Sequence, residues 1–338
     1  MSLLQVQNLV VEFPNRRGTL RALDDISFEI APGEILGVVG ESGAGKSLTG
    51  ASIIGLLEPP GRVASGQILL EGQRIDNLAH EQMRHIRGRK IGAIFQDPLT
   101  SLNPLYTVGR QLTETIQAHL PVNHAEALRR AIGLLEDTGI PAAAERIAHY
   151  PHQFSGGMRQ RVVIALALAA EPKLIVADEP TTALDVSIQA QIIQLLKRVC
   201  KDRGAAVMLI THDMGVIAET CDRVAVMYAG RIAEIGPVHE VINQPAHPYT
   251  AGLMAAIPDI TIERERLNQI DGAMPRLDAI PKGCAFNPRC PRAFDRCMVE
   301  RPGLLEAGAT RAACWLHDRQ SIGAPPPVRP EPVEGPRT

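Results

Sequence analysis

An α/β fold is predicted for this chain of 338 residues by two observations on the order of its segments. First, short apolar runs with the character of β-strands alternate with stretches whose apolar residues recur at helical spacing. Second, the run EILGVVG passes through a glycine-rich turn directly into the helical pattern KSLTGASIIGLL. A strand, a glycine-rich loop and a helix, in this order, form the arrangement that a phosphate-binding loop requires.

The strands expected in chain order are LQVQNLVVEF, ISFEI, EILGVVG, IGAIF at residues 91–95, LIVAD and AVMLITH. Helical periodicity is present in RQLTETIQAHL, HAEALRRAIGLLEDTGI, GMRQRVVIALALAA and VSIQAQIIQLLKRVCK. The stretch RVAVMYAGRIAEIG predicts a β-hairpin that turns at Gly230.

A change of composition near residue 247 divides the chain. We expect a nucleotide-binding domain over residues 1–245, with a helical subdomain at about 97–170. A small, irregular, cysteine-bearing domain is expected over 246–318. Residues 319–338 are expected to be disordered, because their last stretch, APPPVRPEPVEGPRT, has proline at six of fifteen positions. No internal repeat is found, so the chain holds a single nucleotide-binding unit.

Composition excludes several classes of protein. With 35 basic and 37 acidic residues the net charge is −2, so no bulk charge draws the chain to nucleic acid or to an anionic membrane. The longest apolar run, residues 162–170, is nine residues, whereas a membrane-spanning helix needs ~20. The N-terminus lacks the pattern of an export signal, so a cytosolic location is expected and disulfides are not.

The phosphate loop is GESGAGKS at residues 40–47, which matches G-x-x-x-x-G-K-[ST]. The Lys46 ammonium would neutralise phosphate oxygens, and the Ser47 hydroxyl would coordinate Mg²⁺. Alone, the motif predicts only a nucleoside triphosphate. The residues expected to contact it are Gly40, Glu41, Ser42, Gly43, Ala44, Gly45, Lys46, Ser47 and Leu48.

Polar side chains follow three of the predicted strands. After LIVAD, Asp178 would hold Mg²⁺ and Glu179 would act as the general base for the attacking water, unless the pair only begins a surface turn before Pro180. His212 closes the next strand. Alone, a histidine there is more often a solvated loop residue, but with the other motifs His212 is expected at the γ-phosphate. Gln96 ends IGAIF and would either ligate Mg²⁺ or cap the turn that follows.

Four of the six cysteines lie within 31 residues, with the spacing C-x5-C-x6-C-x16-C. This is not the C-x2-C pattern of a structural zinc site, and an irregular loop with four thiolates suits a [4Fe–4S] cluster. Spacing alone leaves the cluster, zinc, and free thiols or disulfides all open. The four are Cys284, Cys290, Cys297 and Cys314; Cys200 and Cys221 are expected to be small buried hydrophobic residues.

The segment FSGGMRQR at residues 154–161 places Ser155 as the cap of a helix with two exposed glycines. With LIVADEPTTALD and THD in the same order, residues 3–240 resemble the ATP-binding subunits of ABC transporters. The resemblance implies a mixed sheet with an inserted helical subdomain, and an ATPase that works as a dimer. The residues that it assigns to nucleotide contact are Phe13 (adenine stacking), Gln96, the signature residues Ser155, Gly156, Gly157 and Gln160, Asp178, Asp185 and the switch histidine His212.

A narrower resemblance rests on FQDPLTSLNP at residues 95–104 and HPYT at residues 247–250. Both look like the subfamily that energises uptake of oligopeptides, dipeptides or nickel. The resemblance implies ATP and Mg²⁺ as cofactors and favours a [4Fe–4S] cluster at the four cysteines. The implied partners are a second ATPase subunit, identical or paralogous, integral membrane permeases and indirectly a solute-binding protein.

The same resemblance implies a peripheral membrane protein on the cytoplasmic face of the inner membrane. A soluble, non-transport ABC ATPase acting on DNA or ribosomes is disfavoured, because such proteins usually carry two ATPase units and this chain has one. The transported solute is chosen by the partners, so the sequence does not name it.

Overall fold

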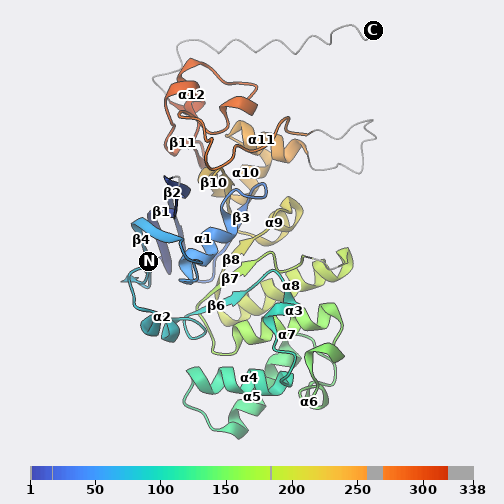
Figure 1. The fold of residues 1–338 in the computed structure, drawn as a ribbon. Coiled ribbons are helices and arrows are strands. Elements are labelled where there is room, and N and C mark those ends of the chain that lie inside the picture. Colours follow the sequence, from blue (N-terminus) through green and yellow to red (C-terminus); the bar gives the residue numbers. More distant parts are fainter. Residues whose placement is uncertain (1, 17, 183–184, 257–268, 319–338) are drawn as a thin grey trace.

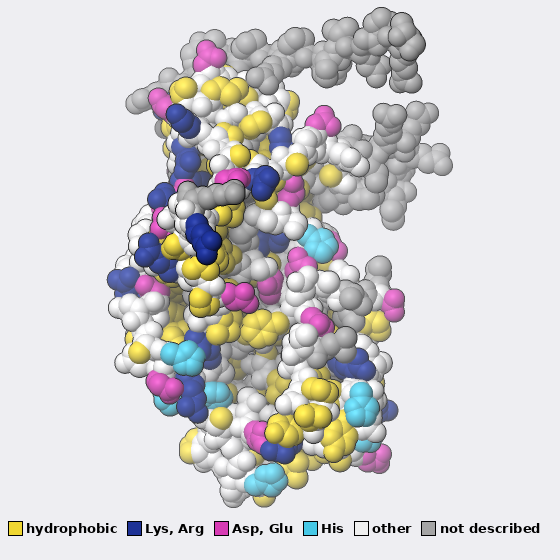
Figure 2. All heavy atoms as spheres, viewed as in Figure 1, with side chains coloured by type: hydrophobic (Ala, Val, Ile, Leu, Met, Phe, Trp, Pro, Cys, Tyr) yellow, Lys and Arg dark blue, Asp and Glu magenta, His cyan; other side chains and the backbone are white. Residues whose placement is uncertain are grey.

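The computed structural model describes residues 2–16, 18–182, 185–256 and 269–318. In Figure 1 the molecule is elongated, with the C-terminal region at one end, a group of helices at the other and the β-sheets between them. The predicted disordered tail, residues 319–338, lies outside the described residues. Acidic and basic side chains are intermixed on the face shown in Figure 2, in keeping with the small net charge.

The core is an eight-stranded mixed sheet in the order β11-β12-β10-β9-β3-β8-β7-β6. Its parallel strands β3 (Ile35–Val39), β7 (Leu174–Asp178) and β8 (Ala206–Ile210) are short apolar runs covered on both faces. β6 (Ile91–Ile94) lies at one edge, and β9 (Arg223–Tyr228) pairs parallel with β3. The predicted α/β fold with a mixed sheet is confirmed.

A second, antiparallel sheet has the order β2-β1-β4-β5. Its strands are β1 (Leu4–Asn15), β2 (Gly18–Ile30), β4 (Arg62–Leu70) and β5 (Gln73–Arg74). The buried side chains of β1, β2 and β4 form one hydrophobic cluster with α1 (Lys46–Ile53), α2 (His80–Ile86) and side chains of the large sheet. The two sheets therefore share a core around the helix that follows the phosphate loop.

Helices between β6 and β7 form the end of the molecule opposite the C-terminal region (Figure 1). They are α3 (Pro98–Ser101), α4 (Val108–His119), α5 (His124–Asp137), α6 (Ala143–Arg146) and α7 (Gly156–Leu168). Thr107, Asn123 and Ser155 each accept a hydrogen bond from a backbone N–H of the first turn, so they act as N-caps. Buried side chains of α4, α5 and α7 pack into one cluster with those of the large sheet.

The remaining helices follow the strands of the large sheet in sequence. They are α8 (Val186–Arg203), α9 (Met214–Thr220), α10 (Val238–Asn243), α11 (Pro248–Ala255) and α12 (Asp295–Val299). In the part of the chain that the structure describes, no helix combines the length and the apolar character needed to cross a bilayer.

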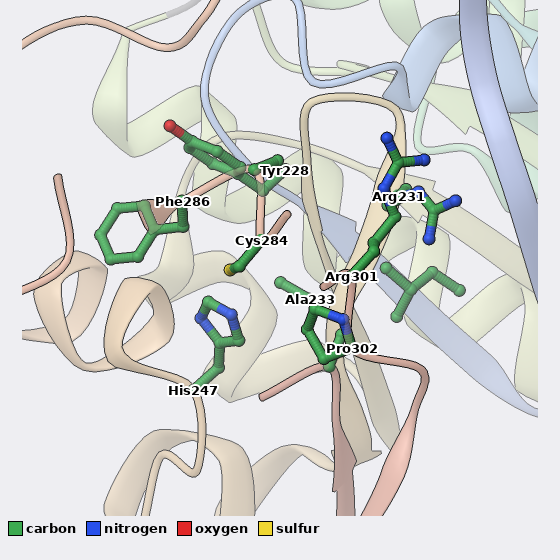
Figure 3. Close-up of a pocket in the computed structure, with 11 residues that line it drawn as sticks. Tyr228, Arg231, Ala233, His247, Cys284, Phe286, Arg301 and Pro302 are labelled. Carbon is green, nitrogen blue, oxygen red and sulfur yellow. The ribbon is translucent and has the colours of Figure 1, made fainter. Parts of the chain in front are cut away.

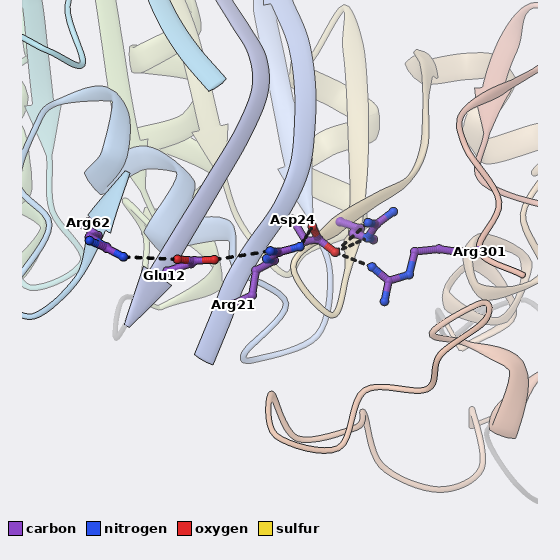
Figure 4. A network of polar contacts seen from close by, with 6 residues as sticks. Glu12, Arg21, Asp24, Arg62 and Arg301 are labelled. Atoms are coloured by element: carbon purple, nitrogen blue, oxygen red, sulfur yellow. Dashed lines mark hydrogen bonds and ion pairs between the residues drawn. The ribbon is translucent and has the colours of Figure 1, made fainter. Parts of the chain in front are cut away.

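The C-terminal region is mostly irregular, as predicted, yet it extends the core sheet. β10 (Arg231–Pro237) pairs antiparallel with β12 (Thr310–Ala312), which pairs with β11 (Leu305–Ala307). Strands of three residues carry too little periodicity to be recognised in the sequence. A polar network adds a second attachment: Asp24 of β2 accepts hydrogen bonds from Arg231 and from Arg301 of the C-terminal region (Figure 4).

Candidate active site

The glycine-rich loop leaves the C-terminal end of β3 and enters α1. Gly40 has φ +156°, and a Cβ there would lie 2.3 Å from the carbonyl oxygen of Met227. Gly45 caps α1 with φ +102°, a left-handed conformation that favours glycine. The loop therefore depends on glycine at both ends, and its backbone leads into the N-terminus of a helix, where anions bind.

Lys46 is buried inside this loop, with 6% of its surface exposed. Its Nζ donates to the carbonyl oxygens of Gly40 at 2.8 Å and Glu41 at 3.1 Å. Burial lowers the pKa of Lys46, while the nearby carboxylates of Glu179 and Asp178 act in the opposite direction. The ammonium is thus placed at the centre of the loop, where it can meet phosphate oxygens.

Ser47 and Asp178 meet although they are 131 positions apart: the Ser47 hydroxyl donates to Asp178 Oδ1 at 3.0 Å. Burial raises the pKa of Asp178, and the charge of Glu179 raises it further, against the opposing effects of Ser47 and Lys46. Hydroxyl and carboxylate oxygens are hard ligands of the kind that Mg²⁺ prefers. The pair therefore fits the predicted role as magnesium ligands.

Glu179 has φ +45°, which is uncommon for a residue with a side chain and occurs most often at functional sites. Its Oε2 accepts hydrogen bonds from Gln96 Nε2 at 3.1 Å and from the Thr182 hydroxyl at 3.0 Å. His212 Nδ1 lies 3.4 Å from Oε1. Three polar side chains thus orient one carboxylate; Thr182 was not predicted, because threonine in a turn gives no specific signal.

A cavity of about 390 Å³ lies at the glycine-rich loop; Asp178 and His212 are not among the described residues of its wall. Phe13, for which adenine stacking is predicted, lies in its wall. The other predicted residues in the wall are Ser42, Gly43, Gly45, Lys46, Ser47, Leu48, Gln96 and Glu179. Ala44, in the middle of the loop, is fully buried, and its N–H donates to the Glu41 carbonyl at 3.1 Å.

The predicted signature residues lie apart from this cavity, since none of them is among the described residues of its wall. Ser155 caps α7 by accepting from the Met158 N–H at 3.4 Å, and Gly156 and Gly157 begin that helix. Gln160 is only 1% exposed, and its Nε2 has no hydrogen-bond partner among the described residues. Asp185 is exposed and precedes α8. In a single chain, therefore, the signature residues and Asp185 do not join the phosphate loop, Gln96 and Glu179 in the wall of the cavity.

The C-terminal region supplies contacts to the loop that the sequence did not predict. Arg289 Nη1 lies 3.0 and 3.1 Å from the two carboxylate oxygens of Glu41. The Tyr249 hydroxyl accepts from the Glu41 N–H at 2.9 Å, and Leu277 lies in the wall of the cavity. These partners are more than 200 positions from the loop, so no local pattern could have identified them.

The four C-terminal cysteines line one small cavity of about 10 Å³. Cys284 also lies beside His247 and Phe286 in a neighbouring cavity (Figure 3). Burial raises the pKa of Cys284 to about 11 and that of Cys314 to about 12. The described residues contain no group of three or more His, Cys, Asp or Glu side chains placed to hold a metal ion. The structure thus gives no direct sign of the predicted cluster. Cys200 and Cys221 are buried, as expected.

Comparison with protein families gives two matches. The ABC transporter family matches residues 23–182, and the C-terminal region of oligopeptide/dipeptide transporters matches residues 233–297. The dipeptide transport ATP-binding protein DppD of Escherichia coli (strain K12) is 47% identical over 304 residues, which are 90% of this chain and 93% of that protein. The oligopeptide transport ATP-binding protein AppD of Bacillus subtilis (strain 168) is 44% identical over 94% of this chain and 98% of its own length.

Solved structures with the same fold include the dimeric post-hydrolysis state of the ATP-binding cassette MJ0796 bound to ADP and Pi. It is 28% identical, with a TM-score of 0.63, over 70% of this chain and 98% of its own. The structure of cbiO1 from Clostridium perfringens, part of the transporter complex cbiONQ, is 30% identical with a TM-score of 0.62 over 72% of this chain.

Proposed function

This chain belongs to the family of ABC transporter ATP-binding subunits, and on that premise we propose that its hydrolysis of ATP powers the uptake of peptides. The observation that carries the proposal is that Lys46, Ser47 and Glu179 line one cavity, with Asp178 hydrogen-bonded to Ser47. The relatives named for dipeptide and oligopeptide transport, which match almost the whole chain, support the class of solute.

Within the site, we assign Glu179 as the base that orients and deprotonates the attacking water. Gln96 and Thr182 occupy Oε2, so Oε1, which lies 3.4 Å from His212 Nδ1, is the oxygen left to accept a proton from the attacking water. Lys46 and the N–H groups of the loop stabilise the phosphate oxygens, which need donors that are already in position before reaction. His212, 69% exposed, would hold the γ-phosphate in line with that water.

A magnesium ion bound with ATP would supply positive charge that offsets the charge of the phosphates. Ser47 and Asp178 are the residues that would hold it, with the Gln96 amide as a third oxygen donor. The exposed Gln96 side chain donates to Glu179 in this structure. We propose that it turns its carbonyl oxygen toward the ion when nucleotide binds.

A second ATPase subunit is required in this proposal, because the signature residues lie outside the cavity of their own chain. Ser155, Gly156 and Gly157 would reach the γ-phosphate bound by the partner, whose own signature would complete the site of this chain. Asp185 would lie at the same interface. Dimers of a related cassette, seen in the MJ0796 structures, support this arrangement.

The substitution Glu179→Gln tests the catalytic assignment. It removes the base but keeps the shape of the side chain, so ATP should bind while kcat falls by roughly a hundredfold or more. The matched control is Glu145→Gln, an exposed glutamate on α6 outside the cavity, which should hydrolyse ATP at the wild-type rate. Hydrolysis by Glu179→Gln at an undiminished rate would exclude Glu179 as the base.

Uptake is tested by co-purification from membranes with permease subunits, followed by ATPase assays in reconstituted vesicles. Dipeptides or oligopeptides, delivered with a binding protein, should stimulate hydrolysis. If nickel alone stimulated hydrolysis, the transported solute would be nickel and not a peptide. Recovery of the chain only from the soluble fraction would contradict a role in transport. The proposed location is the cytoplasmic face of the inner membrane, where the permeases would hold the chain.

We also propose that Cys284, Cys290, Cys297 and Cys314 bind a [4Fe–4S] cluster. Convergence of all four on one cavity supports this, since the cluster would take one thiolate from each. No chemical step is assigned to it. Anaerobic purification should yield brown protein with four irons and four sulfides per chain. Colourless protein with one zinc ion per chain would contradict the proposal.

A further inference from the structure

Glu41 places a carboxylate inside a loop that binds phosphate. It is the second residue of the glycine-rich loop, next to Gly40 and five positions before Lys46. Phosphate groups bring several negative charges to this loop, and like charges at short range oppose binding. The loop is therefore expected to need a compensating positive charge besides Lys46.

Arg289 provides such a charge from the C-terminal region. Its side chain is 6% exposed, and Nη1 lies 3.0 Å from Glu41 Oε1 and 3.1 Å from Oε2. The guanidinium has further partners: Nε donates to the Asp271 carbonyl at 2.9 Å, Nη2 to the Ile270 carbonyl at 3.2 Å and Nη1 to the Tyr228 hydroxyl at 3.3 Å. Backbone carbonyls of the C-terminal region thus orient the guanidinium toward the Glu41 carboxylate.

The backbone of Glu41 is fixed from both sides as well. Its N–H donates to the hydroxyl of Tyr249, which is fully buried, and its carbonyl accepts from Lys46 Nζ. Met274 lies against the next part of the loop, with its ε-methyl 3.1 Å from where a Cβ on Gly43 would stand. Leu277 continues the same segment along the wall of the nucleotide cavity.

We propose that the C-terminal region is a functional part of the ATP site, in which Arg289 neutralises Glu41 and holds the glycine-rich loop ready for phosphate. Arg289 is a positioning residue, because it acts on the nucleotide through Glu41. The inference rests on the proposed ATP site. It adds that nucleotide affinity depends on a side chain outside all of the ATPase motifs.

The test is a cycle of two substitutions in the full chain, with the Kd of Mg-ATP measured by competition against a fluorescent ATP analogue. Arg289→Met removes the charge but keeps much of the length, and leaves the Glu41 carboxylate unpaired beside the phosphates. A hydrogen-bonded charge pair of this kind predicts an affinity loss of about tenfold. The loss should be smaller for AMP, which carries fewer phosphates.

The second substitution separates charge from structure. With Gln at position 41 there is no carboxylate to neutralise, so adding Arg289→Met to Glu41→Gln should cost less than about threefold. If the cost stays tenfold in that background, Arg289 acts only on the fold and the proposal is overturned. Wild-type affinity in Arg289→Met alone would overturn it too.

Two further variants serve as a control and as an alternative test. Arg276→Met, an exposed arginine of the same segment that pairs only with Asp278 among the described residues, should bind ATP as the wild type does. If Arg289→Met does not fold, Tyr249→Phe removes only the hydroxyl on the Glu41 N–H, and should weaken ATP binding by about threefold; unchanged binding would overturn the proposal. Failure of the wild-type chain to bind ATP would refute the ATP site itself.

Discussion

Glu234 offers a quantitative test of how firmly the C-terminal region is joined to the core. Its side chain is completely buried in β10. Oε1 accepts from the Ala246 N–H at 2.9 Å and from the Thr310 hydroxyl at 3.3 Å, and Oε2 accepts from the His247 N–H at 2.9 Å. One carboxylate thus ties the start of the C-terminal region and the strand β12 to the large sheet.

The cost of removing this carboxylate follows from the groups that it leaves behind. Glu234→Ala removes the acceptor from the buried N–H of His247 and the partly buried N–H of Ala246, and each unsatisfied donor costs about 1–3 kcal/mol. With the cavity that also forms, the total loss should be roughly 3–5 kcal/mol. Glu234→Gln keeps one oxygen and turns an NH₂ group toward one N–H, so its cost should be about 1–3 kcal/mol.

The one tryptophan of the chain, Trp315, makes the assay local. It lies in the C-terminal region, where its indole N–H donates to the Glu300 carbonyl at 3.0 Å. Urea unfolding followed by tryptophan fluorescence should show an earlier transition in Glu234→Ala than in Glu234→Gln, and in both earlier than in the wild type. Far-UV circular dichroism on the same samples reports on the whole chain.

The matched control is Glu306→Ala, an exposed glutamate on the neighbouring strand β11, for which the transition should move by less than about 0.5 kcal/mol. The reasoning is refuted if Glu234→Ala leaves the fluorescence transition within that same margin. In that case the hydrogen bonds of the carboxylate would not hold the C-terminal region on the sheet.

Three further predictions concern other parts of the molecule. Burial disfavours the charged form of Asp24, but its contacts with three arginines outweigh this and lower its pKa below the ordinary 3.8. Its stabilising effect is then present at neutral pH and lost as pH falls through the lowered pKa, so Asp24→Asn should be less stable than wild type in urea at neutral pH and equal to it in stronger acid. His212→Ala should reduce kcat for ATP by roughly a hundredfold, measured by phosphate release; a smaller effect than about threefold would remove it from the mechanism. Ser155→Arg, placed in the Glu179→Gln background, should prevent ATP-driven dimerisation on size-exclusion chromatography, whereas dimers in normal yield would contradict an interface role for the signature.

Much of the site was predictable because each of its motifs is a short run of consecutive residues, even though the motifs lie far apart in the sequence. Gly40 and Gly45 both have positive φ, a backbone conformation that the local motif already signals, although the atoms that a Cβ would meet there belong to the distant residues Met227 and Leu23. Asp178 and Glu179 could be placed because β7 is an apolar run buried on both faces, and such a strand ends where polar residues begin. The hairpin at Gly230 was predictable for the same reason, and it is confirmed as β9 and β10.

Contacts that depend on packing between distant segments were not predictable. Arg289 lies 248 positions from Glu41, and nothing in its local sequence distinguishes it from the many exposed arginines around it. The burial of Gln160 likewise depends on how α7 packs, which a signature motif does not reveal. Tertiary packing, which one sequence does not display, decided both.

The boundary that composition suggests near residue 246 therefore has a different meaning in three dimensions. A chain that ended there would lose β11 and β12, which extend the sheet beyond β10. It would also lose the groups that donate hydrogen bonds to the buried Glu234 and the arginine that pairs with Glu41. The first two losses affect stability, but the third acts on the phosphate loop itself. An unpaired carboxylate in this loop would repel the phosphates, and Arg289 of the C-terminal region is the residue that pairs with it. Glu41 and the C-terminal region therefore act together on nucleotide binding. The change in composition marks where the ATPase motifs end, and the ATP site continues beyond it.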